Sequence, residues 1–182
     1  MGEAPFVWDA CGLLNLAATQ RAEEILAALR SPCYVVSELL QGEVLYLRPL
    51  PEEDPQRTKV PVDFTDLLKA GFLKEITLSP EEKVLFTDYA REVDDGEART
   101  AAVAVVRGFQ VVTDDRAAVA FLRRLGAPPR VITTTEWLKF WADAMEVRPE
   151  ALADAVRRVE ECATYRPRRM DPLLEWWTRA RG

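Results

Sequence analysis

The sequence predicts an α/β protein built on a parallel, five-stranded sheet. Short apolar runs of strand length alternate with longer segments in which apolar residues recur at helical spacing. This alternation is typical of βα units, whose helices join parallel strands and cover both faces of a sheet. The five expected strands lie at residues 6–8, 34–36, 72–78, 110–113 and 130–132. Right-handed crossovers leave few topologies for such a chain.

Helix signals fall between these strands. Helical spacing predicts helices over residues 11–29, 38–47, 63–69, 115–125, 149–162 and 173–179. Three more helices begin at capping boxes, which are Ser79 with Glu82, Asp94 with Glu97, and Thr133 with Glu136. The proline-rich stretch 48–61 is expected to be a loop.

The chain is expected to divide near residue 146. Residues 1–146 hold the alternating strands and helices, whereas residues 147–182 are helical only. The helix over 149–162 carries an apolar stripe made of Leu152, Val156, Val159 and Cys162. Such a stripe needs a covering surface. The sequence leaves open whether the domain itself, a second copy of the chain or a protein inhibitor covers it.

The composition excludes several kinds of chemistry. The 182 residues include no histidine, which excludes a Ser-His-Asp triad, a Cys-His dyad and a His-ligated zinc. The three cysteines form no Cys-x-x-Cys pair and fit a reducing cytosol. No signal peptide or membrane-spanning run is visible, so we expect a soluble, cytoplasmic protein. The net charge of −6 is a poor first argument for nucleic-acid binding.

Acidic residues follow two of the expected strands directly. Asp9 comes after strand 6–8, and Asp114 and Asp115 come after strand 110–113. In open parallel sheets, sites form beyond the carboxyl ends of the strands, where the strand order reverses. Asp9 and the Asp114–Asp115 pair would meet there if the first and fourth strands are neighbours.

Two glutamates extend this acidic set. Glu97 lies in the first turn of the helix before strand 110–113, and Glu43 shares a helical face with Leu39 and Leu47. Clustered carboxylates repel one another, and they suit Mg²⁺ or Mn²⁺, which polarise phosphoryl oxygens and activate water. Each acid also has a structural interpretation: Asp114 as an N-cap, Glu97 as half of a capping box and Glu43 as a partly exposed helix residue.

Four motifs, in this order, resemble the PIN-domain family. They are Phe6-Val-Trp-Asp9-Ala-Cys-Gly-Leu13, Val35-Val-Ser37 with Glu43-Val44, Asp95-Gly-Glu97-Ala98, and Val111-Val-Thr113-Asp114-Asp115. The resemblance covers about residues 4–145 and is nearest to the subgroup with Gly-Glu-Ala and Asp-Asp motifs. It implies a three-layer α/β/α fold and a metal-dependent ribonuclease, which is the toxin of a toxin–antitoxin pair in some members. The implied partners are RNA, a protein inhibitor (antitoxin) and a second copy in a homodimer.

The resemblance also implies a role for each motif residue. The catalytic set would be Asp9, Glu43, Glu97 and Asp115, and the ligands of Mg²⁺ or Mn²⁺ would be Asp9, Glu97, Asp115 and Asp114. Thr113 would hold the loop or a metal-bound water, Asp95 would assist, and Cys11 stands where the family commonly has Ser or Thr. Arg116 is the nearest candidate for an RNA contact, and Arg123, Arg124 and the cluster of Arg166, Arg168 and Arg169 are more distant candidates. For this cluster, a solvated face is the favoured expectation.

Other functions compete with a nuclease. An inactive PIN-fold module that binds RNA or a protein would use the same acids as helix caps. A phospho-accepting receiver domain would need an aspartate after the third strand and a lysine after the fifth, where the chain has Leu78-Ser79 and Ile132-Thr133. We therefore set the receiver aside. Trp137 and Trp141, one helical turn apart, are expected to pack in the core rather than to stack on bases.

Overall fold

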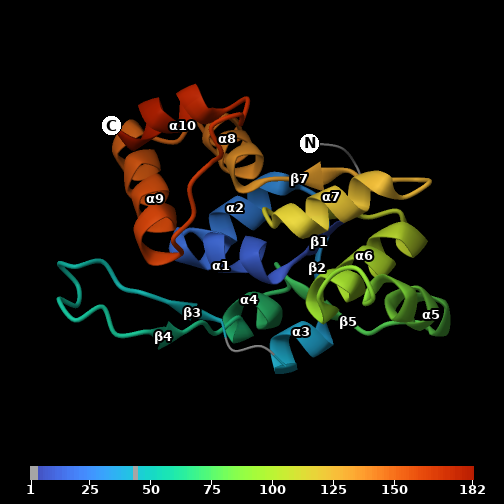
Figure 1. Ribbon diagram of the computed structural model, residues 1–182. Coiled ribbons are helices and arrows are strands. Elements are labelled where there is room, and N and C mark those ends of the chain that lie inside the picture. The colour runs from blue at the N-terminus through green and yellow to red at the C-terminus, as the bar shows by residue number, and fades with distance from the viewer. Residues whose placement is uncertain (1–3, 43–44) are drawn as a thin grey trace.

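Strand β1 (Phe6–Trp8) lies at the centre of an all-parallel sheet in the computed structural model, which describes residues 4–42 and 45–182 (Figure 1). The five strands of this sheet are in the order β5-β2-β1-β6-β7. The other four are β2 (Cys33–Val36), β5 (Lys74–Ile76), β6 (Gln110–Val112) and β7 (Val131–Ile132). The predicted α/β fold with five parallel strands is therefore confirmed.

The neighbours of β1 define the place where the strand order reverses. Trp8 pairs with Val35 of β2 on one side and with Val112 of β6 on the other. Strands β2 and β5 therefore lie on one side of β1, and strands β6 and β7 lie on the other. Because β1 and β6 are adjacent and parallel, the residues that follow them emerge at the same edge of the sheet.

Helices cover both faces of the sheet. Phe6 and Trp8 belong to one apolar cluster and Val7 to another, as expected for alternate residues of a strand. The first cluster includes residues of α1 (Ala10–Ala18), α2 (Ala22–Leu29) and α8 (Thr134–Ala144). The second includes residues of α6 (Asp95–Arg107) and α7 (Arg116–Arg124), with α5 (Pro80–Tyr89) packed against it. The result is the expected three-layer α/β/α arrangement.

Capping explains where three of the helices begin. Ser79 and Glu82 bond each other's main-chain N–H groups before α5, and Asp94 with Glu97 and Thr133 with Glu136 do the same before α6 and α8. Each box satisfies two N–H groups that have no partner inside the helix. All three predicted capping boxes are therefore confirmed.

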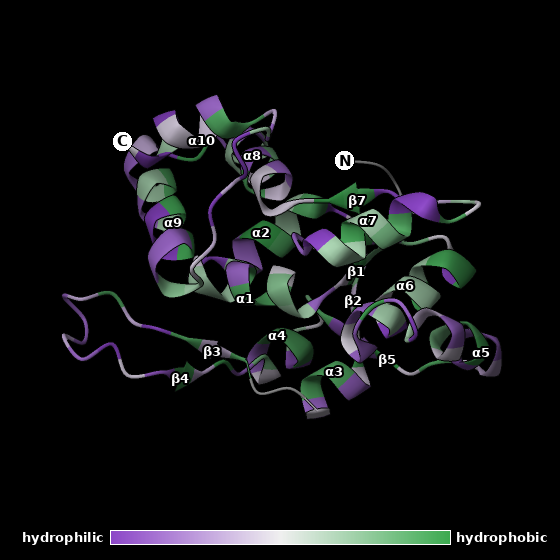
Figure 2. Ribbon diagram, viewed as in Figure 1, coloured by the Kyte–Doolittle hydropathy of each residue, from purple (hydrophilic) through white to green (hydrophobic). Residues whose placement is uncertain are grey.

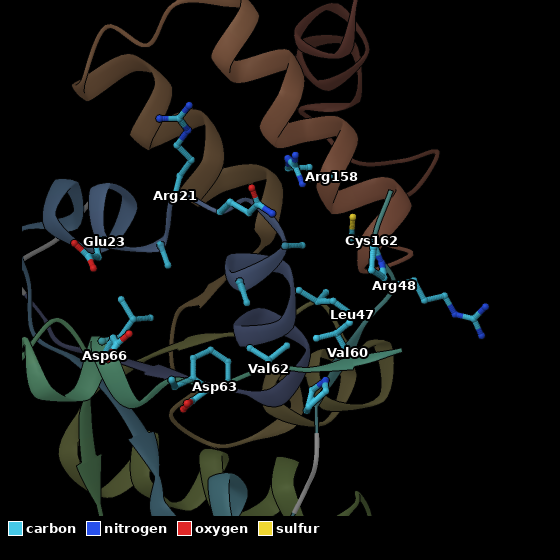
Figure 3. A pocket seen from close by; sticks show the side chains of 18 of the residues that line it. Arg21, Glu23, Leu47, Arg48, Val60, Val62, Asp63, Asp66, Arg158 and Cys162 are labelled. Atoms are coloured by element: carbon cyan, nitrogen blue, oxygen red, sulfur yellow. The ribbon is translucent and has the colours of Figure 1, made fainter. Parts of the chain in front are cut away.

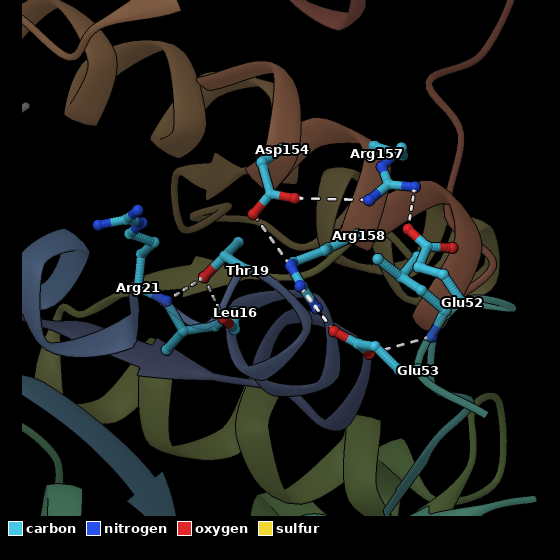
Figure 4. A network of polar contacts seen from close by, with 9 residues as sticks. Leu16, Thr19, Arg21, Glu52, Glu53, Asp154, Arg157 and Arg158 are labelled. Carbon is cyan, nitrogen blue, oxygen red and sulfur yellow. Dashed lines mark hydrogen bonds and ion pairs between the residues drawn. The ribbon is translucent and has the colours of Figure 1, made fainter. Parts of the chain in front are cut away.

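The single helix predicted over residues 11–29 is wrong, because the chain forms α1 and α2 with a break between them. The Thr19 hydroxyl donates to the Leu16 carbonyl at 2.6 Å and accepts from the Arg21 N–H at 3.0 Å (Figure 4). A hydroxyl that bonds nearby main-chain groups offers the backbone an alternative to helical bonding. Gln20 completes the break with a φ of 55°, which a continuous helix does not allow.

The helix predicted over 38–47 is also too long. α3 ends at Gly42 (Ser37–Gly42), and β3 (Tyr46–Leu47) pairs with β4 (Val60–Pro61) in an antiparallel hairpin. Leu47 lies in β3 and not on the helical face that it was expected to share with Glu43, and Glu43 itself lies outside the described residues. The stretch 48–61 was expected to be entirely loop, but its last two residues form β4. A second short helix, α4 (Thr65–Lys69), follows the hairpin.

The C-terminal helices pack on the domain. The apolar stripe of α9 (Pro149–Cys162) is buried, with Val156 and Val159 fully enclosed in the same cluster as Trp8. α10 (Leu174–Arg181) adds the buried Trp177, whose Nε1 donates to Glu160 at 2.9 Å. Trp137 and Trp141 are fully buried in this cluster too, as expected.

Ion pairs join α9 to the loop of the hairpin. Glu52 contacts Arg157 at 2.6 Å, and Glu53 contacts Arg158 at 2.7 Å (Figure 4). Arg158 also contacts Asp154 of its own helix at 3.0 Å. This loop is largely hydrophilic (Figure 2). Within the described part of the chain, none of the helices has the length and apolar character needed to cross a membrane.

Candidate active site at the carboxyl ends of β1 and β6

Asp9 is the residue that leaves β1. Its N–H donates to the Val112 carbonyl of β6 at 3.0 Å, so the parallel pairing of the two strands continues one residue past β1. Its side chain is buried, and Oδ2 accepts a hydrogen bond of 2.9 Å from the Thr113 hydroxyl. Burial raises the pKa of Asp9, and the bond from Thr113 opposes that rise. The adjacency expected for Asp9 and the residues after strand 110–113 is confirmed.

Gly12 allows the first turn of α1 to approach the end of β6. A Cβ at this position would lie 2.9 Å from the Val112 carbonyl oxygen and 3.1 Å from the Val112 side chain. Any larger residue would force α1 away from the strand. Gly12 therefore helps to hold Asp9 and Thr113 within hydrogen-bond distance.

Cys11 takes the place expected for Ser or Thr and makes similar bonds. Its sulfur lies 3.6 Å from Asp9 Oδ2 and 3.3 Å from Thr113 Oγ1, and it accepts the Asp114 N–H at 3.3 Å. Burial, and then the charge of Asp9, raise the pKa of Cys11 to about 12. The group is thus a neutral thiol that connects the ends of the two strands, not a nucleophile.

Glu97 and Asp115 bring two carboxyl groups into contact. Asp115 is the N-cap of α7 and accepts the N–H groups of Ala117 and Ala118 at 2.6 and 3.0 Å. Glu97 is hydrogen-bonded to Asp115, which requires one of the two groups to carry a proton. Burial, then the bond to Asp115 and the charges of Asp94 and Asp115, raise the pKa of Glu97 to about 8.

Asp115 remains the ionised partner of this pair. Burial raises its pKa, but the bonds from Ala118, Glu97 and Ala117 outweigh burial and lower it below the ordinary value. Glu97 therefore holds the shared proton at neutral pH. Two carboxyl groups in contact are what a divalent cation stabilises, because it replaces the proton between them.

Asp94 links the two parts of the acidic cluster. It accepts the Glu97 N–H at 2.9 Å as the N-cap of α6. Its charge raises the pKa of both Asp9 and Glu97. Asp9, Asp94, Glu97 and Asp115 thus share one electrostatic environment. The sequence predicted only a capping role for Asp94, although Asp94 stands beside Asp95 and Glu97 in the same acidic motif.

Asp114 points to other partners. Its carboxylate accepts hydrogen bonds from the Thr134 N–H at 3.0 Å, from the Thr134 hydroxyl at 2.5 Å and from the Asn15 amide at 3.2 Å. These bonds tie the end of β6 to the start of α8 and to α1. The structural interpretation expected Asp114 to cap the next helix, but Asp115 is the cap. Asp114 instead holds α8 in place.

Two of the remaining predicted residues are exposed on the surface. Asp95 forms an exposed ion pair with Arg99 at 3.2 Å on the surface of α6. Arg116 is exposed as the first residue of α7, and within residues 4–42 and 45–182 it has no carboxylate partner. Glu43 lies outside the described residues.

The donor chemistry of the cluster fits a hard divalent cation. Its candidate ligands are all carboxylate oxygens, which Mg²⁺ and Mn²⁺ prefer. Among the residues that the structure describes, however, no three His, Cys, Asp or Glu side chains are placed together as a metal-binding group. The clearest place for a cation is therefore the Glu97–Asp115 contact, with Asp9 at the same edge of the sheet.

Several polar residues of this region were missed from the sequence. Asn15 is buried, and its amide also donates to the Thr134 hydroxyl at 2.9 Å. A buried Asn on the apolar face of a helix was a detectable signal, because its amide needs partners. Tyr165 interacts with Asp114, whose charge, after burial, raises the pKa of the phenol above its usual range. Arg168 donates to the Asp114 carbonyl at 3.1 Å. Neither Tyr165 nor Arg168 stands in a sequence pattern that predicts its contact with Asp114.

A cavity of about 570 Å³ lies elsewhere, between α1, α2, α4, the hairpin and α9 (Figure 3). Apolar groups such as Leu47 and Val62 line it, and charges of both signs, including Arg21, Asp63 and Arg158, surround them. None of the predicted site residues lines this cavity. The mixed charges favour no particular class of ligand.

The fold and the acidic edge define this chain as an α/β/α protein with carboxylates clustered at the switch point of its sheet. Comparisons with protein-family models, with curated proteins and with solved structures found no match.

Proposed function

We propose that this protein is a metal-dependent ribonuclease whose site is formed by Asp9, Glu97 and Asp115. The observation that supports the proposal best is the contact between the Glu97 and Asp115 carboxyl groups at the sheet edge where Asp9 emerges. A helix cap needs one carboxylate, and α6 and α7 already have Asp94 and Asp115 as caps. Glu97 also accepts the Asp94 N–H at 3.3 Å as the other half of the capping box, but this bond does not require a second carboxyl group pressed against Asp115.

The three acids would hold Mg²⁺ or Mn²⁺. The cation would supply a polarised phosphoryl oxygen and an activated water, chemistry that needs no histidine. Thr113 and Cys11 would orient the Asp9 carboxylate, since both contact its Oδ2 atom. Asp94 would strengthen the negative potential that attracts the cation. The expected role of Glu43 remains part of this proposal.

The motif resemblance supports RNA as the substrate class. The order of Asp9, Glu97, Thr113 and Asp115 along the chain resembles the motif order of the PIN-domain ribonucleases, and the five-stranded parallel sheet agrees with the fold that the resemblance implies. A toxin paired with a protein inhibitor is the corresponding biological role. The buried stripe of α9 leaves such an inhibitor, or a second copy, to bind another face.

An inactive PIN-fold module that binds RNA or a protein is the second candidate. It is favoured by the lack of a three-residue metal-binding group among residues 4–42 and 45–182. The cytosol is the proposed location for either function, because the cysteines of the described segments are free thiols.

Cleavage of an unstructured RNA oligonucleotide separates the two candidates. We expect cleavage that depends on Mg²⁺ or Mn²⁺ and that Asp9→Asn abolishes, since the substitution removes the charge but keeps an acceptor for Thr113. Asp143→Asn is the matched control, because Asp143 is exposed on α8 in an ion pair with Lys139. A folded protein that cleaves no RNA, with or without these metals, would identify the inactive module.

A further inference from the structure

The C-terminal strap, residues 163–173, connects α9 to α10 and passes the acidic edge of the sheet (Figure 1). It is held at both ends. Tyr165 interacts with the Asp114 carboxylate near its start, and its ring packs edge-on against Trp177 at 5.5 Å. Near its end, Asp171 accepts a hydrogen bond of 3.0 Å from the Thr135 hydroxyl. The residues between Tyr165 and Asp171 are thereby fixed beside the end of β6.

Arg168 lies in the middle of this strap. Its Nη2 donates to the main-chain carbonyl of Asp114 at 3.1 Å. That carbonyl belongs to the peptide that joins Asp114 to Asp115, so the guanidinium stands one peptide from an acid of the proposed site. Its side chain is exposed. A guanidinium has five N–H donors, and among residues 4–42 and 45–182 the Arg168 guanidinium makes a single hydrogen bond.

The charge of Arg168 has no carboxylate partner in the part of the chain that the structure describes. Arg166, also in the strap, lies 3.7 Å from Glu160. Neither Arg168 nor Arg169 forms an ion pair within the described segments of the chain, and the same holds for Arg116 on the other side of Asp115. Free arginines on an edge that is otherwise acidic supply what a phosphodiester backbone needs, namely positive charge and paired N–H donors.

We propose that Arg168 is a substrate-positioning residue that binds an RNA phosphate next to the acidic site, with Arg116 and Arg169 extending the same surface. This inference rests on the proposed function. The carboxylates repel a polyanion unless cations compensate them. An arginine held on the Asp114–Asp115 peptide provides that compensation at a fixed position. The expectation that residues 166–169 form only a solvated face is thereby replaced for Arg168.

Binding of a fluorescent, unstructured RNA oligonucleotide, followed by anisotropy in EDTA, tests the proposal without cleavage. We expect Arg168→Ala and Arg168→Gln each to weaken binding about tenfold. Each should also reduce the slope of log affinity against log salt by about 0.7, the value for one contact with a single-stranded phosphate. Arg168→Lys should keep most of the slope. Arg179→Ala is the control, because Arg179 is exposed and lies on α10, outside the strap.

Arg168→Gln separates two roles of Arg168, which are the hydrogen bond to the Asp114 carbonyl and the binding of an RNA phosphate. Glutamine keeps an N–H donor for the Asp114 carbonyl but loses the charge. Normal RNA affinity in Arg168→Gln, or an equal loss in Arg179→Ala, would contradict the proposal, because the effect would then be structural or merely a matter of net charge. Melting temperatures of all four variants show that each is folded.

The outcome for Arg168 is distinguishable from that for the nuclease. If Asp9→Asn abolishes cleavage while Arg168→Gln binds RNA normally, Arg168 has no role in binding and the nuclease stands. If RNA binding requires Arg168 but no metal supports cleavage, the strap is an RNA-binding surface on an inactive module. If the wild-type protein binds no RNA in EDTA but cleaves it with Mg²⁺ or Mn²⁺, the proposal for Arg168 is wrong and the nuclease stands; if it neither binds nor cleaves RNA, both proposals are wrong.

Discussion

The Thr113 hydroxyl donates to Oδ2 of Asp9 at 2.9 Å and joins the carboxyl ends of β1 and β6. The Thr113 hydroxyl oxygen also accepts the Asp115 N–H at 3.2 Å, so one buried hydroxyl positions the residues that follow both strands. Thr113 thus donates its hydrogen to Asp9, which is the most deeply buried carboxylate of the proposed site. The bond therefore orients the Asp9 carboxylate and opposes the rise in pKa that burial causes.

Thr113→Val should weaken the site through Asp9. Valine has the shape of threonine but no donor, so Asp9 keeps its burial and loses a bond that lowers its pKa. We expect a loss of about 1–3 kcal/mol in the free energy of unfolding and weaker binding of Mn²⁺, measured by urea unfolding and by metal titration. Thr113→Ser keeps the hydroxyl and should retain both properties. Similar Mn²⁺ affinity in the two variants would show that Asp9 does not need this bond.

The Glu97–Asp115 pair predicts a pH dependence in the presence of a chelator. The pKa of Glu97 is about 8 in the folded protein, against an ordinary value of 4.5. Because the folded protein retains the proton longer, the contribution of Glu97 to stability is complete below pH 4.5 and is lost as pH rises through about 8.

Glu97→Gln should remove this dependence while keeping the capping interaction with Asp94. Melting temperatures of the two proteins in EDTA, taken from pH 5 to 9, should therefore diverge with rising pH, with Glu97→Gln the more stable at the alkaline end. Parallel curves would contradict the shared proton.

An ion pair between Glu82 and Arg107 joins α5 to α6, the helices on the face of the sheet that Val7 contributes to. Glu82 is fully buried and accepts two bonds from Arg107, at 2.5 and 2.8 Å. Arg107→Ala leaves this carboxylate without its partner and should cost about 3–5 kcal/mol. Arg124→Ala breaks an exposed pair with Glu92 and should cost about 1 kcal/mol or less. Urea unfolding of both variants measures the difference between their free energies of unfolding. Because each variant loses one positive charge, the change in net charge cannot account for that difference.

The same pair predicts sensitivity to acid. Hydrogen bonding to Arg107 lowers the pKa of Glu82 below its ordinary value. The stabilisation is therefore present above the unfolded pKa and is lost as pH falls through the folded one. Glu82→Gln should flatten this part of the stability profile below about pH 4.5.

Gly12→Ala tests the close approach of α1 to β6. The added methyl group meets the Val112 carbonyl oxygen at 2.9 Å, so helix or strand must shift. We expect a loss of about 1–3 kcal/mol and reduced Mn²⁺ binding, because Asp9 precedes this turn. Gly126→Ala is the control, since a Cβ at Gly126 meets no atom within 4 Å. An unchanged Gly12→Ala protein would mean that the contact relaxes without effect on the site.

Local signals predicted most of the fold. The apolar runs and the alternation over residues 72–78 predicted all five strands of the sheet, because each strand is short; β1 and β6 are also buried throughout, whereas β5 is largely exposed. The capping boxes at Ser79, Asp94 and Thr133 marked helix starts because the bonding is local. The β3–β4 hairpin was missed because Tyr46 and Leu47 continue a helical spacing from α3, and only pairing with distant residues makes them a strand.

The site was predictable where strand order alone positions it. Asp9 and Asp115 follow adjacent strands, and Glu97 lies at the start of the helix that feeds β6. The sequence could not distinguish the roles of Asp114 and Asp115, because the contacts of Asp114 come from α8 and Tyr165. Arg168 is 54 residues from the carbonyl it contacts, so no local pattern places it there.

Thermal melting during a Mn²⁺ titration tests the central claim most directly, because a ligand that binds only the folded state stabilises it by mass action. At about 100 times the dissociation constant the wild-type protein should gain about 2.7 kcal/mol, or roughly 5–10 °C in melting temperature for a chain of this size. Asp9→Asn and Glu97→Gln should lose most of this gain, whereas Asp143→Asn should keep it. A wild-type protein whose melting temperature does not change with Mn²⁺, or an Asp9→Asn protein that gains as much, would contradict a metal site built on Asp9, Glu97 and Asp115.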